Sequence, residues 1–176
     1  MKHLILIMVA LLLGVPSANA EDREPKFNQI KRSDPEMQRA YDLASETISA
    51  FIKKVQVGGD ATFLAKLKFR VPELSEHMGS DQFLYIWLNG VAYHPEENLL
   101  SGVFFELPKS LSKWHRVGER LGFYPEDVFD WMIIENGIAQ GGYTIKAMRS
   151  RLKTEEEKAR YDEYIGIKSY QPVLGR

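Results

Sequence analysis

The chain has 176 residues, a formal net charge of −1 and no cysteine. A charge so close to zero gives no indication of nucleic acid or an anionic membrane as a partner. The lack of cysteine excludes a disulfide framework, a thiol nucleophile and a thiolate metal site. We therefore expect stability to come from packing alone, with most of the aromatic side chains in the core.

The first twenty residues have the pattern of a signal peptide. A short basic start precedes an apolar run from Leu4 to Leu13, which is shorter than the ~20 residues that a membrane-spanning helix needs. The segment closes on Ala18-Asn19-Ala20, and small residues at the first and third places before the cut fit a signal peptidase. We expect cleavage after Ala20, a periplasmic or secreted product, and no membrane insertion after cleavage.

The remaining chain is expected to hold one domain. Residues 21–32 are charged and contain Pro25, which predicts a flexible leader. Residues 33–167 are expected to form a single α+β domain and residues 168–176 a tail. A helix is predicted from Pro35 to about Val55, because a capping residue and acidic first turn precede apolar residues spaced by three and four.

Three strands are predicted after this helix. Residues 63–71 alternate between apolar and mostly basic side chains, which predicts one dry face, and a polar loop containing His77 follows. Residues 83–88 are apolar on both faces and predict a central strand covered on each side. Residues 99–107 predict its antiparallel partner.

The region from Asp130 to Thr144 predicts a hairpin that closes one end of the sheet. Asn136-Gly137 favours a type I′ turn, because both central positions need positive φ. Thr144 is a candidate cap for the next helix, and a capping box at Thr154 begins a last polar helix. The fold class is therefore α+β: a twisted antiparallel β-sheet of about four to six strands, with the N-terminal amphipathic helix packed on it and short C-terminal helices.

Candidate chemistry in the chain is sparse. Asp127 and Asp130 could share acid and base roles, but short acids at such positions more often bond backbone N–H groups. The histidines after the predicted signal peptide have no metal-ligand spacing, so we expect no metal and no cofactor; they are His77, His94 and His115. No serine lies in a nucleophile elbow.

The glycine pair and the tryptophans also allow two interpretations each. Gly141-Gly142 could cradle a phosphate, yet the glycine fingerprint and the lysine of known phosphate loops are missing, so a bend or bulge is favoured. Trp87 and Trp131 could form a ligand platform, but aromatic residues on strands are more often core.

Several of these residues also carry a family resemblance. Trp87-Leu88, Gly102, Pro108 and the block from Asp130-Trp131-Met132 to Gly141-Gly142-Tyr143-Thr144 resemble the bacterial DUF2314 family, including its small exported YegJ-like members. The resemblance covers roughly residues 63–149. It implies a compact α+β domain of uncharacterised function, without an assigned catalytic residue, metal or cofactor. One departure is that Leu84-Tyr85-Ile86 precede Trp87, where members often have a polar pair.

The family-motif residues, expected to be structural or binding residues, are Trp87, Asp130, Trp131, Gly141, Gly142, Tyr143 and Thr144. The first hypothesis for function is a non-enzymatic binding or protective module of the cell envelope, with a protein partner there. A hydrolase is the second, using Asp130 or Asp127 with Tyr143 or His115. The third is an immunity-type protein that binds a toxin.

Overall fold

The computed structural model describes residues 34–172. The expected signal peptide, leader and cleavage site lie outside the described residues. The helices are α1 (Pro35–Val57), α2 (Pro72–Met78), α3 (Tyr143–Ser150) and α4 (Glu155–Ile165), with short 3₁₀ turns η2 (Lys109–Leu111) and η3 (Pro125–Asp127). The strands are β1 (Thr62–Arg70), β2 (Phe83–His94), β3 (Leu99–Phe104), β4 (Arg120–Phe123), β5 (Asp130–Glu135), β6 (Ile138–Gly141) and β7 (Ser169–Tyr170).

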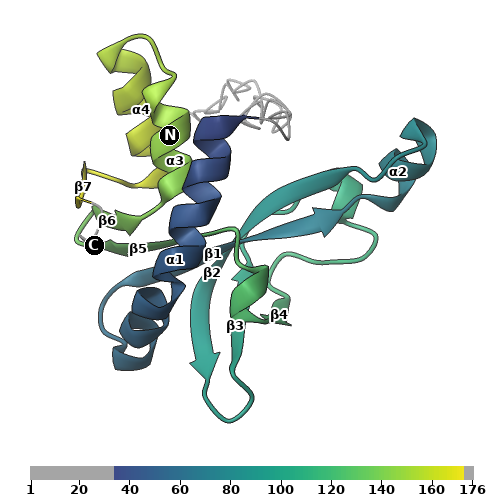
Figure 1. The fold of residues 1–176 in the computed structure, drawn as a ribbon, viewed down its shortest axis with the longest axis horizontal. Coiled ribbons are helices and arrows are strands. Elements are labelled where there is room, and N and C mark those ends of the chain that lie inside the picture. The colour runs from purple at the N-terminus through teal and green to yellow at the C-terminus, as the bar shows by residue number, and fades with distance from the viewer. Residues whose placement is uncertain (1–33, 173–176) are drawn as a thin grey trace, which may run out of the picture. The chain divides into compact units, whose positions relative to one another are not determined.

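Within the described region, seven strands form one sheet in the order β4-β3-β2-β1-β5-β6-β7. All neighbours are antiparallel except β6 and β7. The predicted α+β class is confirmed, with α1 preceding a mostly antiparallel sheet and short helices at the C-terminal end (Figure 1). The sheet has one strand more than the four to six that were expected, because β7 forms in residues that were expected to be a tail.

The α1 helix begins where its capping residue predicts. The Asp34 carboxylate accepts hydrogen bonds from the N–H groups of Glu36 and Met37. The helix ends at Gly58, whose φ of 70° suits a glycine. Its buried face packs on the sheet and consists of Met37, Ala40, Ala44, Phe51 and Val55.

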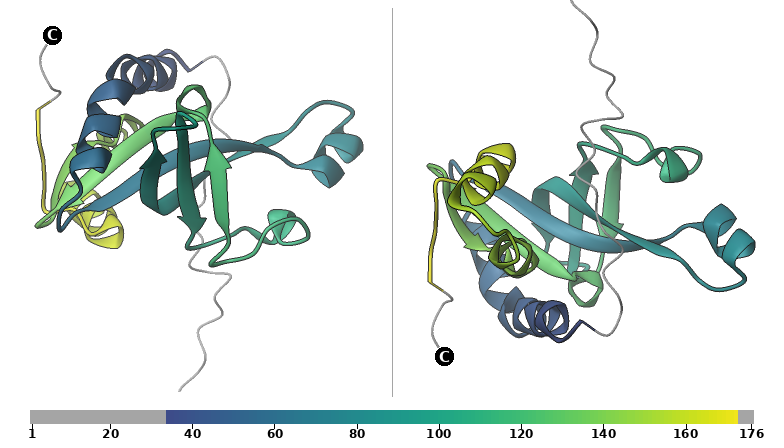
Figure 2. Two further views of the ribbon diagram at one scale, coloured as in Figure 1. Left: turned by 90° about the horizontal axis from the view of Figure 1, so that it is seen from below. Right: turned by 90° about the horizontal axis from the view of Figure 1, so that it is seen from above.

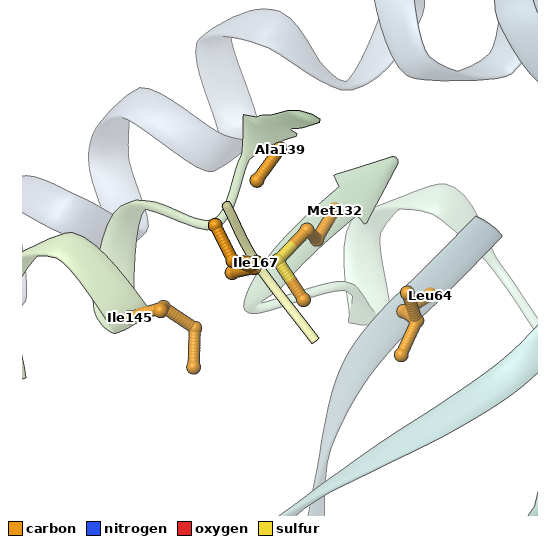
Figure 3. Close-up of a cluster of buried hydrophobic side chains, with 5 residues drawn as sticks. All are labelled: Leu64, Met132, Ala139, Ile145 and Ile167. Atoms are coloured by element: carbon orange, nitrogen blue, oxygen red, sulfur yellow. The ribbon is translucent and has the colours of Figure 1, made fainter. Parts of the chain in front are cut away.

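The register of β1 separates two covered faces. Ala65 lies opposite Leu88 on β2 and Trp131 on β5, and this face packs against α1, where Phe51 stacks on Trp131. Lys66 lies between Trp87 and Asp130 on the other face. There a cluster of Leu64, Met132, Ala139, Ile145 and Ile167 joins the sheet to α3 and the end of α4 (Figure 3). Figure 2 shows α1 and α4 on opposite sides of this half of the sheet.

One local expectation was wrong, and two predicted elements form with a difference. The polar loop around His77 is the helix α2, because Pro72 both ends β1 and occupies the first turn of a helix. Strand β2 is longer than the predicted residues 83–88, because it bends at Gly90 through a bulge and continues to His94, with a register shift between Asn89 and Ala92. The predicted hairpin forms towards one end of the sheet, with Asn136 and Gly137 at φ of 53° and 80°, and β7 adds one more strand beside β6.

A search of the described helices finds none with the length and apolar character needed to cross a membrane.

Candidate functional site

The Asp130 carboxylate is fully buried and caps helix α3 from a neighbouring strand. Its Oδ1 accepts hydrogen bonds from the backbone N–H groups of Trp131 (2.8 Å) and Tyr143 (3.2 Å). Its Oδ2 accepts from the Thr144 N–H (2.8 Å) and the Thr144 hydroxyl (2.6 Å). The residue at the N-cap position is Gly142, which has no side chain to offer. Asp130 therefore replaces the local cap that such a helix start requires.

The expectation that Thr144 caps this helix was wrong. The helix begins one residue earlier, at Tyr143, so Thr144 lies inside the first turn. Its hydroxyl donates to Asp130 and accepts a hydrogen bond from the Lys66 ammonium at 3.1 Å. Thr144 thus connects a buried carboxylate to a buried amine that lies on the adjacent strand.

Burial controls the charges in this Lys66–Thr144–Asp130 chain. Burial lowers the pKa of Lys66 to about 8, although the nearby Asp130 charge opposes the shift. Burial also raises the pKa of Asp130, against the bonds from Thr144 and the charge of Lys66. Four donors point at the two Asp130 oxygens, and this arrangement suits the ionised carboxylate. The Lys66 ammonium also lies over the rings of Tyr85 and Trp87, at 6.0 and 5.5 Å from their centroids.

Gly141 and Gly142 are needed for close packing. Both have positive φ, 75° and 61°. A Cβ on Gly141 would overlap the carbonyl oxygen and the ring of Trp131, and one on Gly142 would lie 3.0 Å from the Met132 sulfur. The Gly142 N–H donates to the Trp131 carbonyl at 2.7 Å, so that donor is already in use. The pair therefore forms a tight bend, and its geometry gives no support to a phosphate cradle.

Trp131 and Tyr143 complete the interior between the sheet and α1. The Trp131 side chain is 1% exposed, stacks on Phe51, and donates its indole N–H to the Ala44 carbonyl and the Thr47 hydroxyl, both at 3.2 Å. The Tyr143 hydroxyl lies 2.9 Å from the same Thr47 oxygen. Burial raises the pKa of Tyr143. Both rings are therefore core side chains whose polar atoms have partners.

Trp87 is the most open of the family-motif residues. It lies half-buried on β2, against the cluster of Leu64 and Met132, with Lys66 over its ring. It packs on the edge of the core, where Tyr161 and Tyr170 are also partly buried against the same cluster.

The hydrolase hypothesis pairs Asp130 or Asp127 with Tyr143 or His115, and among the described residues no hydrogen bond joins the side chains of such a pair. Asp130 contacts the backbone of Tyr143, while the phenol hydroxyl pairs with Thr47. His115 packs against Phe69 and Phe104 in the other half of the sheet. Asp127 accepts from the Tyr124 N–H at 3.1 Å, which is the backbone role expected for it.

The histidines lie on three different segments of the fold. His77 is on α2, His94 ends β2 beside Ser101, and His115 lies in the segment between β3 and β4. Among residues 34–172, no group of three or more His, Asp or Glu side chains could hold a metal ion.

Comparison with known proteins assigns the domain to a family. A family model described as "Uncharacterized protein conserved in bacteria (DUF2314)" matches residues 34–169. The chain belongs to the DUF2314 family. It is also 27% identical over 141 residues to a "Putative ankyrin repeat protein" of Neisseria meningitidis serogroup B, covering 78% of this chain and 54% of that protein. The chain thus spans about half the length of the curated relative it matches, and no solved structure matches.

The DUF2314 domain also has a surface hollow that the sequence did not predict. It lies in the segment between β3 and β4, has a volume of about 460 Å³, and is lined by Lys113, Trp114, His115, Arg116, Val117 and Glu119. The Trp114 side chain is 45% exposed and Val117 is 63% exposed. The only signal in the sequence was the concentration of Trp, His and Arg in a stretch without periodicity.

This hollow rests on a fixed base. The His115 ring centroid lies 4.8 Å from that of Phe104 and 5.5 Å from that of Phe69. Glu119 pairs with the His115 Nδ1 at 3.0 Å and accepts from the Arg116 N–H at 2.9 Å. The bond from His115 lowers the pKa of Glu119. An ion pair between Lys113 and Glu73 ties the segment to α2. The segment that carries the exposed side chains is therefore attached to the sheet and to α2.

Proposed function

We propose that this DUF2314 protein is a non-enzymatic binding module of the bacterial cell envelope, and that it binds a protein partner through the hollow around Trp114. The observation that carries the proposal is the contrast between two clusters. The buried polar groups of the motif block are satisfied by one another, whereas large apolar side chains near Trp114 remain exposed on an anchored segment.

The composition of the hollow suits protein recognition. Tryptophan and arginine are the residues most enriched at the energetic centres of interfaces. Trp114 and Val117 offer apolar surface, and Phe105, close by in the chain, is also exposed. Arg116 makes no ion pair through its side chain with any described residue. A partner that presents an apolar side chain beside a carboxylate would fit this combination.

Site-specific photo-crosslinking tests the binding surface. A benzophenone amino acid is placed at Trp114 or, as a matched control, at Tyr164, which is 60% exposed on α4. Irradiation of cells that express the full chain should give a discrete crosslinked protein from position 114 and none from position 164. Equal products from both positions, or no discrete product from 114, would contradict the proposal. Mass spectrometry of the product would also show whether the partner is a toxin, as the immunity hypothesis requires.

Export is the second part of the proposal, and it is supported by the signal-peptide pattern of the first twenty residues. Cell fractionation and N-terminal sequencing test it. The expected product is periplasmic or secreted and begins at Glu21. A full-length chain in the cytoplasmic fraction would contradict this part and leave the binding proposal to the crosslinking result.

A further inference from the structure

A second polar cluster shares no residue with the Asp130 network or with the lining of the Trp114 hollow. It occupies the half of the sheet formed by β2, β3 and β4. The Ser101 hydroxyl lies 2.9 Å from His94 Nε2 and accepts a hydrogen bond from Arg120 Nη1 at 3.1 Å. Each of the three residues comes from a different strand. Ser101 is 5% exposed, whereas His94 and Arg120 are exposed and lie around it.

The bulge in β2 fixes the arginine. Gly90 has a φ of 57°, and its carbonyl accepts from Arg120 Nη1 at 3.2 Å. The guanidinium therefore crosses from β4 over β3 to β2 and is held by two uncharged oxygens. Bulges commonly redirect a side chain or backbone group beside a functional site.

The charge of this arginine is not neutralised locally. Arg120 forms no ion pair with an acidic side chain in residues 34–172, and both of its hydrogen bonds use the same nitrogen, Nη1. The other guanidinium nitrogens, Nε and Nη2, keep their donors available. A planar guanidinium held in a fixed orientation is the group that best binds carboxylate and phosphate by two parallel hydrogen bonds.

Ser101 serves the site by positioning the arginine. It is buried between small cross-strand neighbours, Ala92 and Gly122, and the Leu99 side chain lies against Gly122. Its oxygen accepts from Arg120 Nη1 and therefore lies on the edge of the guanidinium opposite to Nε and Nη2.

We propose that Arg120, positioned by Ser101 and by the bulge in β2, binds an oxyanion of the carboxylate or phosphate type. Arg120 supplies the charge and the paired donors Nε and Nη2, while Ser101 and the Gly90 carbonyl hold Nη1 on the opposite edge of the guanidinium. The distance between His94 and Ser101 would also suit a nucleophile and its base. Within the described residues, however, no hydrogen bond orients the other imidazole nitrogen, and the geometry favours binding over acyl transfer.

Nuclear magnetic resonance of the ¹⁵N-labelled protein tests this site at constant ionic strength, with inorganic phosphate or acetate replacing chloride. The expected result is a saturable shift of the Ser101 and Gly122 amide signals and of the Arg120 Nε–H signal. Saturation by phosphate alone, by acetate alone or by both identifies the group that the site accepts. Shifts that never saturate with either anion would overturn the proposal, because they would report ionic atmosphere only.

Variants show whether the arginine is responsible. Arg120→Gln should weaken binding by roughly tenfold or more, the usual effect of losing charge-assisted hydrogen bonds. Arg39→Gln, which removes an exposed arginine of α1 that forms no ion pair with a described residue, should leave binding unchanged. If Arg120→Gln does not fold, Arg120→Lys keeps the charge but loses the planar fork, and it should fold and bind more weakly. Unchanged affinity in the folded Arg120 variant would overturn the assignment.

Discussion

Replacing Asp130 by asparagine keeps the size of the side chain and removes its charge. The amide can still accept at one oxygen, but its NH₂ group then faces the Thr144 N–H, which is also a donor. An unsatisfied buried donor costs about 1–3 kcal/mol. The Lys66 ammonium loses its nearby compensating charge as well; removing one partner of a directly bonded buried pair costs about 3–5 kcal/mol, and the Thr144 bridge makes the loss here smaller. Because these contributions overlap, we expect Asp130→Asn to lower the free energy of unfolding by about 3–5 kcal/mol.

Urea unfolding followed by tryptophan fluorescence measures this loss. Asp127→Asn is the matched control, since Asp127 is exposed at the end of η3 and accepts one backbone N–H; it should cost about 1 kcal/mol or less. Adding Lys66→Met to Asp130→Asn should recover about 1 kcal/mol or more, because it removes the uncompensated charge. A loss below about 1 kcal/mol for Asp130→Asn would refute the structural role assigned to this carboxylate.

Three further predictions concern the same interior and its control positions. Gly141→Ala should destabilise the fold by at least about 2 kcal/mol more than Gly166→Ala, because both glycines have positive φ but only the first would overlap Trp131; equal losses in urea unfolding would contradict this. Trp131→Ala should lower the free energy of unfolding by about 3–5 kcal/mol and Trp114→Ala by less than about 0.5 kcal/mol. The reverse order in calorimetry would show that Trp131 is not part of the core. The pKa of Lys66 is about 8 in the folded protein and near 10.4 in the unfolded chain, so the unfolded chain binds more protons between these two pH values. The free energy of unfolding of the wild type, measured relative to Lys66→Met, should therefore rise with pH across this window. A free-energy difference that falls with pH would contradict the lowered pKa.

Local rules predicted the elements that depend on neighbouring residues. Pro35 and Asp34 gave the start of α1, and Asn136-Gly137 gave the turn between β5 and β6. Thr154 and Glu157 form the predicted capping box at the start of α4. In each case the atoms that decide the structure are at most three residues apart, so a single sequence contains the information.

The same rules could not predict contacts between distant segments. Lys66 alternates with apolar residues and was expected on a wet face, but α3 and α4 cover that face and bury it. Asp130 caps a helix that begins thirteen residues later, and no local pattern reports a cap supplied by another strand. The pairing of His94 with Ser101 and Arg120 depends on the bulge in β2 and on the register of three strands.

Amide hydrogen exchange at Trp131, Tyr143 and Thr144 tests most directly whether the motif block is a sealed interior. These three N–H groups donate to the Asp130 carboxylate in a fully buried setting. They should exchange only by global unfolding, with protection that tracks the free energy of unfolding measured in urea. Exchange of these amides much faster than global unfolding would show that water reaches the Asp130 carboxylate in the folded protein, and would contradict a sealed interior.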